Sequence, residues 1–225
     1  MKVQGINERV RGILFDMDGL LMNSEKLYWQ ANIVAAKEAH INVPDDLYLK
    51  LVGSSEDEMN HFYHRYFSSY EQRNRFIKRT NELVWQWTDE GKLKLLPGVQ
   101  RALDCFQHLA LSMAIVTSNT EEVVEHNLWV TGIRNYFDFH LNSADIYRNH
   151  IKPKPEPDIY LLAAERMGLP KRNLLAFEDS SSGVKSATSA GIKCVMIPNL
   201  LPANNQDKDS AVDVCSSFDE FLEKI

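Results

Sequence analysis

Two carboxylates, Asp16 and Asp18, are the first residues of this chain whose types and spacing could do chemistry. They follow the apolar segment Gly12–Phe15, and Gly19 comes directly after them. Side chains alternate along an extended backbone, so both carboxylates start on the same side of the chain. Two acids at one edge suit a hard cation, or a nucleophile beside a proton donor. Taken alone, the pattern could equally be a solvated turn.

Polar residues also accompany three later apolar segments of the chain. Three of them, Thr117, Ser118 and Asn119, come at the end of segment 113–117. The others are Lys154, which precedes a helix predicted over 157–167, and the acids Glu178 and Asp179, which follow segment 173–177. Ligands of parallel α/β sheets bind outside the carboxyl ends of the strands. We therefore expect these residues to gather at one edge of a sheet.

The elements that would position these residues are short apolar strands alternating with helices, which indicates a parallel sheet covered on both faces. The predicted fold is an α/β, Rossmann-like core with an inserted α-helical domain, because the segment from residue 23 to 91 has no convincing strand. Residues 1–22 and 92–225 form the predicted catalytic core, and residues 23–91 the predicted cap. We expect strands over 12–15, 113–117, 137–141, 173–177, 193–197 and 212–214, helices over 121–129, 157–167, 182–190 and from 218, and a surface loop over 202–209.

The composition of the chain argues against several functional classes for this protein. The 225 residues carry a net charge of −6, which argues against nucleic-acid binding. No apolar run approaches the roughly 20 residues of a membrane span, and the first residues lack the apolar stretch of a signal peptide. The three cysteines are widely spaced, as in proteins of a reducing compartment. We expect a cytoplasmic protein, working as a monomer, with neither nucleic acid nor membrane as a partner.

The chemistry that fits these residues is phosphoryl transfer. A phosphate monoester repels a bare carboxylate nucleophile, so positive charge is needed. Mg²⁺ held by Asp16 and Asp179 would supply part of it, and Lys154 the rest. Thr117 offers a hydroxyl donor, and backbone amides at the strand ends, those of Met17, Asp18, Ser118 and Asn119, could bind phosphate oxygens.

Two assignments keep alternatives at this point. Lys152 competes with Lys154, although flanking prolines restrict the directions in which Lys154 can point. Glu178 and Asp179 could instead stabilise the N-terminus of the next helix.

Together these residues resemble the haloacid dehalogenase superfamily of phosphohydrolases, and the likeness covers nearly the whole chain. Four motifs carry it in order: Asp16-Met17-Asp18-Gly19, Thr117, Lys154 in Lys-Pro-Glu-Pro-Asp, and Phe177-Glu178-Asp179-Ser180. The segments Gly-Leu-Leu-Met-Asn-Ser-Glu and Phe-Glu-Asp-Ser-Ser-Ser-Gly-Val are similar to the β-phosphoglucomutase-like branch, which has a helical cap.

The resemblance implies a role for each site residue. Asp16 would be the nucleophile that forms an aspartyl-phosphate, and Asp18 the general acid and base. The implied Mg²⁺ ligands are Asp16, Asp18 through its carbonyl, Asp179, and Glu178 either directly or through a ligand it orients. The implied phosphate-binding residues are Thr117, Ser118, Asn119 and Lys154.

Three residues of this chain differ from those typical of the β-phosphoglucomutase-like branch, and such differences help to distinguish a phosphatase from a mutase. Asn23 stands where aspartate is common, Glu56 where the mutase places an arginine for its second phosphate, and Tyr28 near a mutase histidine. Glu56 would repel a bisphosphorylated intermediate, so the sequence favours a Mg²⁺-dependent phosphatase of small phosphorylated metabolites over a sugar phosphomutase. A dehalogenase does not need an acid two residues after the nucleophile, yet this chain has Asp18 there. A non-catalytic binding protein does not need the motifs to be intact, yet they are. Both observations disfavour these alternatives.

Overall fold

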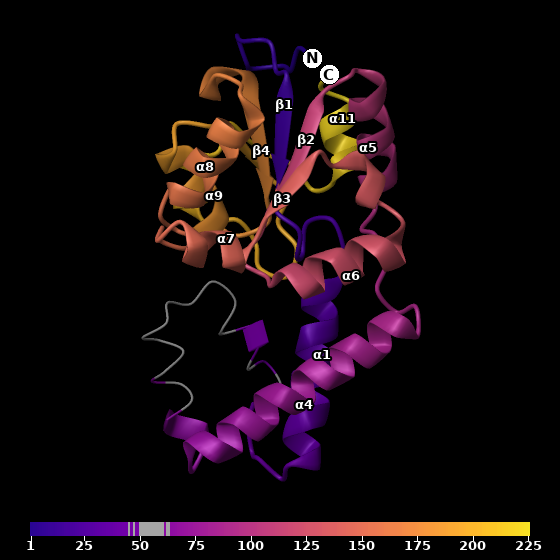
Figure 1. The fold of residues 1–225 in the computed structure, drawn as a ribbon, viewed down its shortest axis with the longest axis vertical. Helices are drawn as coiled ribbons and strands as arrows, with labels where there is room; N and C mark the ends of the chain where they lie inside the picture. Colours follow the sequence, from indigo (N-terminus) through magenta and orange to yellow (C-terminus); the bar gives the residue numbers. More distant parts are fainter. Residues whose placement is uncertain (45, 47, 50–60, 62–63) are drawn as a thin grey trace. The chain divides into compact units, whose positions relative to one another are not determined.

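The computed structural model describes residues 1–44, 46, 48–49, 61 and 64–225. The chain divides into two compact units, which Figure 1 shows as ribbons. Unit 1 consists of Met1–Met22 and Leu95–Ile225, and unit 2 of Asn23–Lys94. The first division falls at the predicted boundary and the second lies three residues after it. The functions of core and cap that the sequence suggested for these segments remain predictions.

Unit 1 contains a six-stranded sheet in the order β3-β2-β1-β4-β5-β6, with every neighbouring pair parallel. The strands are β1 (Gly12–Phe15), β2 (Ser112–Val116), β3 (Phe139–Leu141), β4 (Leu174–Glu178), β5 (Lys193–Met196) and β6 (Asp213–Val214). This strand order is that of doubly wound nucleotide-binding folds. The predicted α/β core is confirmed.

Helices cover both faces of the sheet. Successive strand residues point to opposite faces, so each strand offers apolar side chains to the helices on both sides. On one face, Leu14 joins a buried cluster with residues of α8 (Asp158–Met167) and α9 (Ser181–Ser189). On the other, Phe15 lies among aromatic rings from α5 (Val99–His108) and α11 (Phe218–Leu222). Figure 1 shows these two pairs of helices on opposite sides of the strands.

On the second face of the sheet, a cluster of aromatic rings holds the two central strands together. The Phe15 and Phe177 rings, from β1 and β4, stack with centroids 5.6 Å apart. Phe221 of α11 packs edge-on against Phe177 at 4.8 Å, and Phe106 of α5 stacks against Phe177 at 6.0 Å. Such pairs add about 0.5–1.5 kcal/mol each beyond burial of their area. The cluster therefore fixes the strands whose ends carry Asp16 and Glu178.

The remaining helical elements of unit 1 connect the strands. They are α6 (Glu121–Thr131), η1 (Arg134–Tyr136), α7 (Ser143–Arg148), η2 (Lys171–Asn173) and α10 (Asn205–Ser210).

The prediction of a surface loop over 202–209 was wrong, because α10 occupies most of this segment. Asn204 and Asp207 form a capping box, in which each side chain accepts a hydrogen bond from the other residue's backbone N–H. Ser181 Oγ also donates to Asp207 at 2.7 Å. Two reciprocal caps satisfy the N–H groups that a helix start leaves open, so a strongly polar segment forms a helix here.

Unit 2 is helical where it is described. Its main elements are α1 (Ser24–Glu38) and α4 (Tyr70–Asp89), which pack through a cluster that includes Ala31, Ala35 and Phe76. Arg79 of α4 forms a two-point ion pair with Glu38 of α1, with its shorter contact at 2.6 Å. Among the described residues, no helix is both long and apolar enough to cross a membrane.

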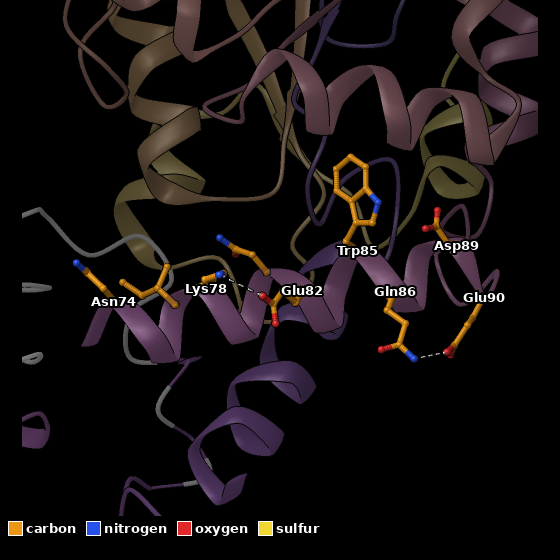
Figure 2. Close-up of a pocket in the computed structure, with 9 residues that line it drawn as sticks. Asn74, Lys78, Glu82, Trp85, Gln86, Asp89 and Glu90 are labelled. Carbon is orange, nitrogen blue, oxygen red and sulfur yellow. Dashed lines mark hydrogen bonds and ion pairs between the residues drawn. The ribbon is translucent and has the colours of Figure 1, made fainter. Parts of the chain in front are cut away.

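An open groove of about 930 Å³ runs along one face of α4, from Asn74 to Glu90. Figure 2 shows Trp85 standing out from the helix above the groove's polar residues, with Gln86 hydrogen-bonded to Glu90 at 2.7 Å. Lys78 and Glu82 approach to 3.9 Å along the same face. This groove contains none of the residues that the sequence singled out for chemistry.

The aromatic cluster generates a stability prediction. Phe221→Ala should lower the free energy of unfolding of unit 1 by about 3–5 kcal/mol, because it removes a buried ring and leaves a cavity beside Phe177. Urea denaturation followed by circular dichroism measures this. Trp129→Ala is the control, since this residue is 77% exposed, and it should change stability by less than about 0.5 kcal/mol. Equal effects of the two substitutions would contradict the packing argument.

Candidate active site

The candidate active site lies where β1, β2 and β4 end, side by side. β1 is hydrogen-bonded to β2 on one side and to β4 on the other. Asp16 directly follows β1, Thr117 directly follows β2, and Glu178 is the last residue of β4. The sequence had placed Glu178 after its strand, whereas strand pairing to Met196 of β5 extends through it. Three polar side chains from distant parts of the chain therefore meet at one sheet edge.

The backbone turns tightly after Asp16, and Gly19 makes this turn possible. Gly19 has φ 73°, in the left-handed region that other residues avoid. The Leu21 N–H donates to the Met17 carbonyl at 2.9 Å, and the Asn199 side chain donates to the Gly19 carbonyl at 2.9 Å. Met17 is fully buried, as the alternation of side chains predicts. The turn keeps Asp16 and Asp18 at the strand ends while Met17 packs inward.

The Lys154 ammonium is the central cation of this edge. It donates to Asp16 Oδ1 at 2.7 Å, to Glu178 Oε1 at 2.6 Å and to the Val116 carbonyl at 2.8 Å. An ammonium has three N–H donors, so all of them are used. Burial lowers the pKa of Lys154, but the charges of Asp16 and Glu178 outweigh burial and hold it above its ordinary value. Lys154 therefore stays charged between two carboxylates.

The two oxygens of Glu178 have different surroundings. Oε1 accepts hydrogen bonds from Lys154 and from the Tyr160 hydroxyl, each at 2.6 Å. Oε2 is buried and has no hydrogen-bond partner. A Cβ at Gly183 would lie 1.8 Å from Oε2, so only glycine leaves room for the carboxylate at this position. Burial raises the pKa of Glu178 to about 7; the Lys154 charge opposes this rise and the Asp16 charge adds to it.

These acids fit a divalent cation. Asp16, Glu178 and Asp179 each offer a carboxylate oxygen, and the three oxygens lie within 4.8 Å of one another. The unpartnered Oε2 of Glu178 is the kind of buried acceptor that a cation would satisfy. Mg²⁺ prefers oxygen ligands and is bound through few carboxylates together with water and phosphate. The donor set is therefore suitable for Mg²⁺, while the predicted contribution of the Asp18 carbonyl remains a prediction.

Asp18 lies beside the residues that follow β2. Asn119 Nδ2 donates to Asp18 Oδ2 at 2.7 Å, and Thr117 Oγ1 lies 3.5 Å from the same oxygen. The Asn119 backbone N–H donates to Thr117 Oγ1 at 3.2 Å. The backbone N–H of Asn119, which the sequence predicted to bind phosphate, therefore donates to the Thr117 hydroxyl. The side chain of Asn119 is the group that contacts an acid of the site, Asp18.

The other residues that the sequence suggested for the site differ in how far they are exposed. Ser118 and Lys152 are both exposed, whereas the Lys154 side chain is only 7% exposed. Asp179 is half-buried within the acidic cluster. Glu56 lies outside the described residues, so the argument from it against a mutase remains an expectation.

Sequence reasoning missed Tyr160 and Gly183. Tyr160 lies on the buried face of α8, and a signal for it was available, because a buried tyrosine hydroxyl needs a polar partner. Gly183 offered no such signal, because its importance comes from how closely the Glu178 carboxylate approaches the first turn of α9.

The position of Lys154 generates a stability prediction. Lys154→Met should lower the free energy of unfolding without metal by about 3–5 kcal/mol, because Asp16 and Glu178 lose their buried countercharge. Added Mg²⁺ should then stabilise the variant more than it stabilises the wild-type protein. Urea denaturation in EDTA and in Mg²⁺ measures both effects. Lys152→Met, at an exposed position two residues away, is the matched control; similar losses in both variants would refute the assignment.

Comparison with known proteins supports one family for this chain. The model of the haloacid dehalogenase-like hydrolases matches residues 13–197. The phosphorylated carbohydrates phosphatase of Thermotoga maritima is 31% identical over 185 residues, covering 82% of this chain and 83% of that protein. A Drosophila melanogaster protein described as a probable pseudouridine-5′-phosphatase is 29% identical over 221 residues, covering 95% and 92%.

Solved structures agree in fold. A Thermotoga maritima protein described as a candidate β-phosphoglucomutase has a TM-score of 0.77 and 28% identity, covering 95% of this chain and 97% of its own. CbbY from Rhodobacter sphaeroides, solved in complex with phosphate, has a TM-score of 0.77 at 23% identity, covering 94% and 96%. The family match spans most of the chain, from the strand before Asp16 to the end of β5, and so this protein belongs to the haloacid dehalogenase-like hydrolases.

Proposed function

We propose that this protein is a Mg²⁺-dependent phosphatase that hydrolyses a small phosphorylated metabolite through an aspartyl-phosphate on Asp16. The observation that carries the proposal is the Lys154 ammonium bound to both Asp16 and Glu178 at the ends of neighbouring strands. A purely structural ion pair would not need a third acid, yet Asp179 also contributes to the cluster. An ionised carboxylate beside fixed positive charge is what attack on a phosphate dianion requires.

Positive charge must offset the repulsion between substrate and nucleophile. When bound, Mg²⁺ supplies such charge to the phosphoryl oxygens, and Asp16, Glu178 and Asp179 are the residues that would hold it. Lys154 supplies a second, permanent positive charge, because its neighbours keep it protonated. Thr117 lies at the adjacent strand end and offers a hydroxyl donor to a phosphoryl oxygen. The substrate phosphate would thus meet donors and cations instead of bare carboxylates.

In the first step, an Asp16 oxygen attacks phosphorus while the bond from phosphorus to the leaving oxygen breaks. The leaving oxygen keeps the bonding electron pair and takes a proton from Asp18, so an alcohol departs. In the second step, water attacks phosphorus and gives a proton to Asp18, and the bond to Asp16 breaks. Phosphate leaves, and both acids return to their starting states.

The substrate class follows from chemistry and from relatives. One relative is named for phosphorylated carbohydrates and another for pseudouridine 5′-phosphate, which are both phosphomonoesters of a sugar hydroxyl. We propose a substrate of this kind, a sugar phosphate or a nucleotide-like phosphomonoester, with residues 23–91 acting as the cap that selects it. Tyr28, which stacks parallel to Tyr48 with centroids 6.4 Å apart, is one of the aromatic side chains this segment offers.

A sugar phosphomutase is the second candidate, favoured by the likeness to a candidate β-phosphoglucomutase. The two functions share the first step and differ in the acceptor of the phosphoryl group, which is water in one and a sugar hydroxyl in the other. Release of inorganic phosphate therefore distinguishes them.

The test is a phosphate-release screen over sugar phosphates, nucleotides and generic phosphomonoesters with Mg²⁺. The wild-type protein should release phosphate from some of them, and Asp16→Asn should reduce the rate by at least about 10³-fold, because the nucleophile is lost. EDTA should abolish release. Asp209→Asn, at an exposed position of α10, is the matched control and should retain full activity.

Two results would contradict the proposal. One is an Asp16→Asn variant that keeps its activity while folded, as judged by circular dichroism. The other is interconversion of hexose 1- and 6-phosphates with no net phosphate release, which would establish the mutase instead.

A further inference from the structure

The main chain of Asn119 is fixed at both of its polar groups. Its N–H donates to Thr117 Oγ1 at 3.2 Å, and its carbonyl accepts from the N–H of Ser143, the first residue of α7, at 2.8 Å. The next residue, Thr120, is the N-cap of α6. Asn119 is therefore held between the end of β2 and the starts of two helices, with little freedom to move.

Its side chain is directed at an acid of the site, with Nδ2 donating to Asp18 Oδ2 at 2.7 Å. We infer that Asn119 is a positioning residue, which holds the Asp18 carboxyl in the orientation that lets Oδ1 exchange a proton with the leaving group. This inference rests on the proposed phosphatase function, because the acid–base role of Asp18 is part of it. It replaces the phosphate-binding role suggested for Asn119 by the sequence.

The hydrogen bond fixes more than a direction. An amide NH₂ group only donates, so Asp18 Oδ2 accepts, and because the carbonyl oxygen of a neutral carboxyl accepts better than its hydroxyl oxygen, this contact favours the proton on Oδ1. One contact thus restricts the rotation of the carboxyl and favours one oxygen as the carrier of the proton. Thr117 Oγ1, at 3.5 Å from Oδ2, is at the limit of hydrogen bonding and contributes less.

The consequence depends on the leaving group. When the bond between phosphorus and the leaving oxygen breaks, an alkoxide is too basic to depart without the proton from Asp18 Oδ1. A p-nitrophenolate ion departs with the electron pair and needs no proton. Loss of positioning should therefore slow alkyl phosphates selectively, whereas loss of phosphate binding would slow both kinds of substrate alike.

The experiment compares Asn119→Ala and Asn119→Leu with the wild-type protein at saturating Mg²⁺. The substrates are glycerol 2-phosphate, or another alkyl phosphate found in the screen, and p-nitrophenyl phosphate. Because kcat/KM reports the steps up to bond breaking, it should fall about 30-fold for the alkyl ester and less than about threefold for the aryl ester. Asn119→Leu retains side-chain volume without a donor, so it should behave as Asn119→Ala does.

Two controls separate positioning from structural damage. Asn173 Nδ2 donates to the Arg9 carbonyl at 2.8 Å, next to the opposite end of β4, so Asn173→Ala loses a comparable hydrogen bond away from the site. It should leave the ratio of the two kcat/KM values unchanged. In an Asp18→Asn background, Asn119→Ala should cause no further loss with the alkyl ester, because Asn119 acts through Asp18.

Each remaining outcome is decisive. Equal losses with both substrates, or a further loss in the Asp18→Asn background, would overturn the positioning role while leaving the phosphatase intact. If the wild-type protein released no phosphate from any substrate, the proposed function would fail, and the positioning role would fail with it.

Discussion

The placement of one ammonium between two buried carboxylates is the constraint on which the site depends. Asp16 and Glu178 end neighbouring strands, and without Lys154 their charges would repel across a poorly solvated space. Buried carboxylates in that position would take up protons or move apart. With Lys154 in place, Asp16 has a positive charge 2.7 Å from Oδ1, which suits its proposed role as nucleophile, while Glu178 keeps Oε2 directed at the space beside Gly183. The same contact that stabilises the fold therefore prepares a carboxylate for chemistry.

The strand order makes this placement possible. Because β1 lies between β2 and β4, three strand ends that are far apart in sequence open onto the same point. Phe15 and Phe177 immediately precede Asp16 and Glu178 in the sequence, and their rings stack, so one aromatic cluster holds the strands that carry the acids. Hydrogen bonds tie the loop after β2 to α7 through Asn119, which brings Asp18 under the same control. The residues of the polar edge are thus tied by hydrogen bonds and packing to the core beneath them.

The sequence predicted the parallel α/β core because short apolar strands and helices alternate visibly along the chain. It also indicated which strand ends carry polar groups, since residues such as Asp16 directly follow apolar segments. Contacts that depend on packing were not predictable: the room left by Gly183, the reach of the Asn119 side chain, and the identity of Glu178 as the partner that a buried Tyr160 hydroxyl requires. The wrong prediction for the α10 segment has a related cause, because its polar composition concealed a reciprocal capping pair.

The most direct test of the central claim is to trap the phosphorylated residue. The enzyme is mixed with substrate and Mg²⁺, quenched in acid during turnover, reduced with borohydride and digested for mass spectrometry. Borohydride reduces an acyl phosphate to an alcohol, so the account predicts homoserine at position 16, present only when substrate was added. Reduction at another acid, or an unmodified Asp16 in an enzyme shown to be turning over, would contradict it.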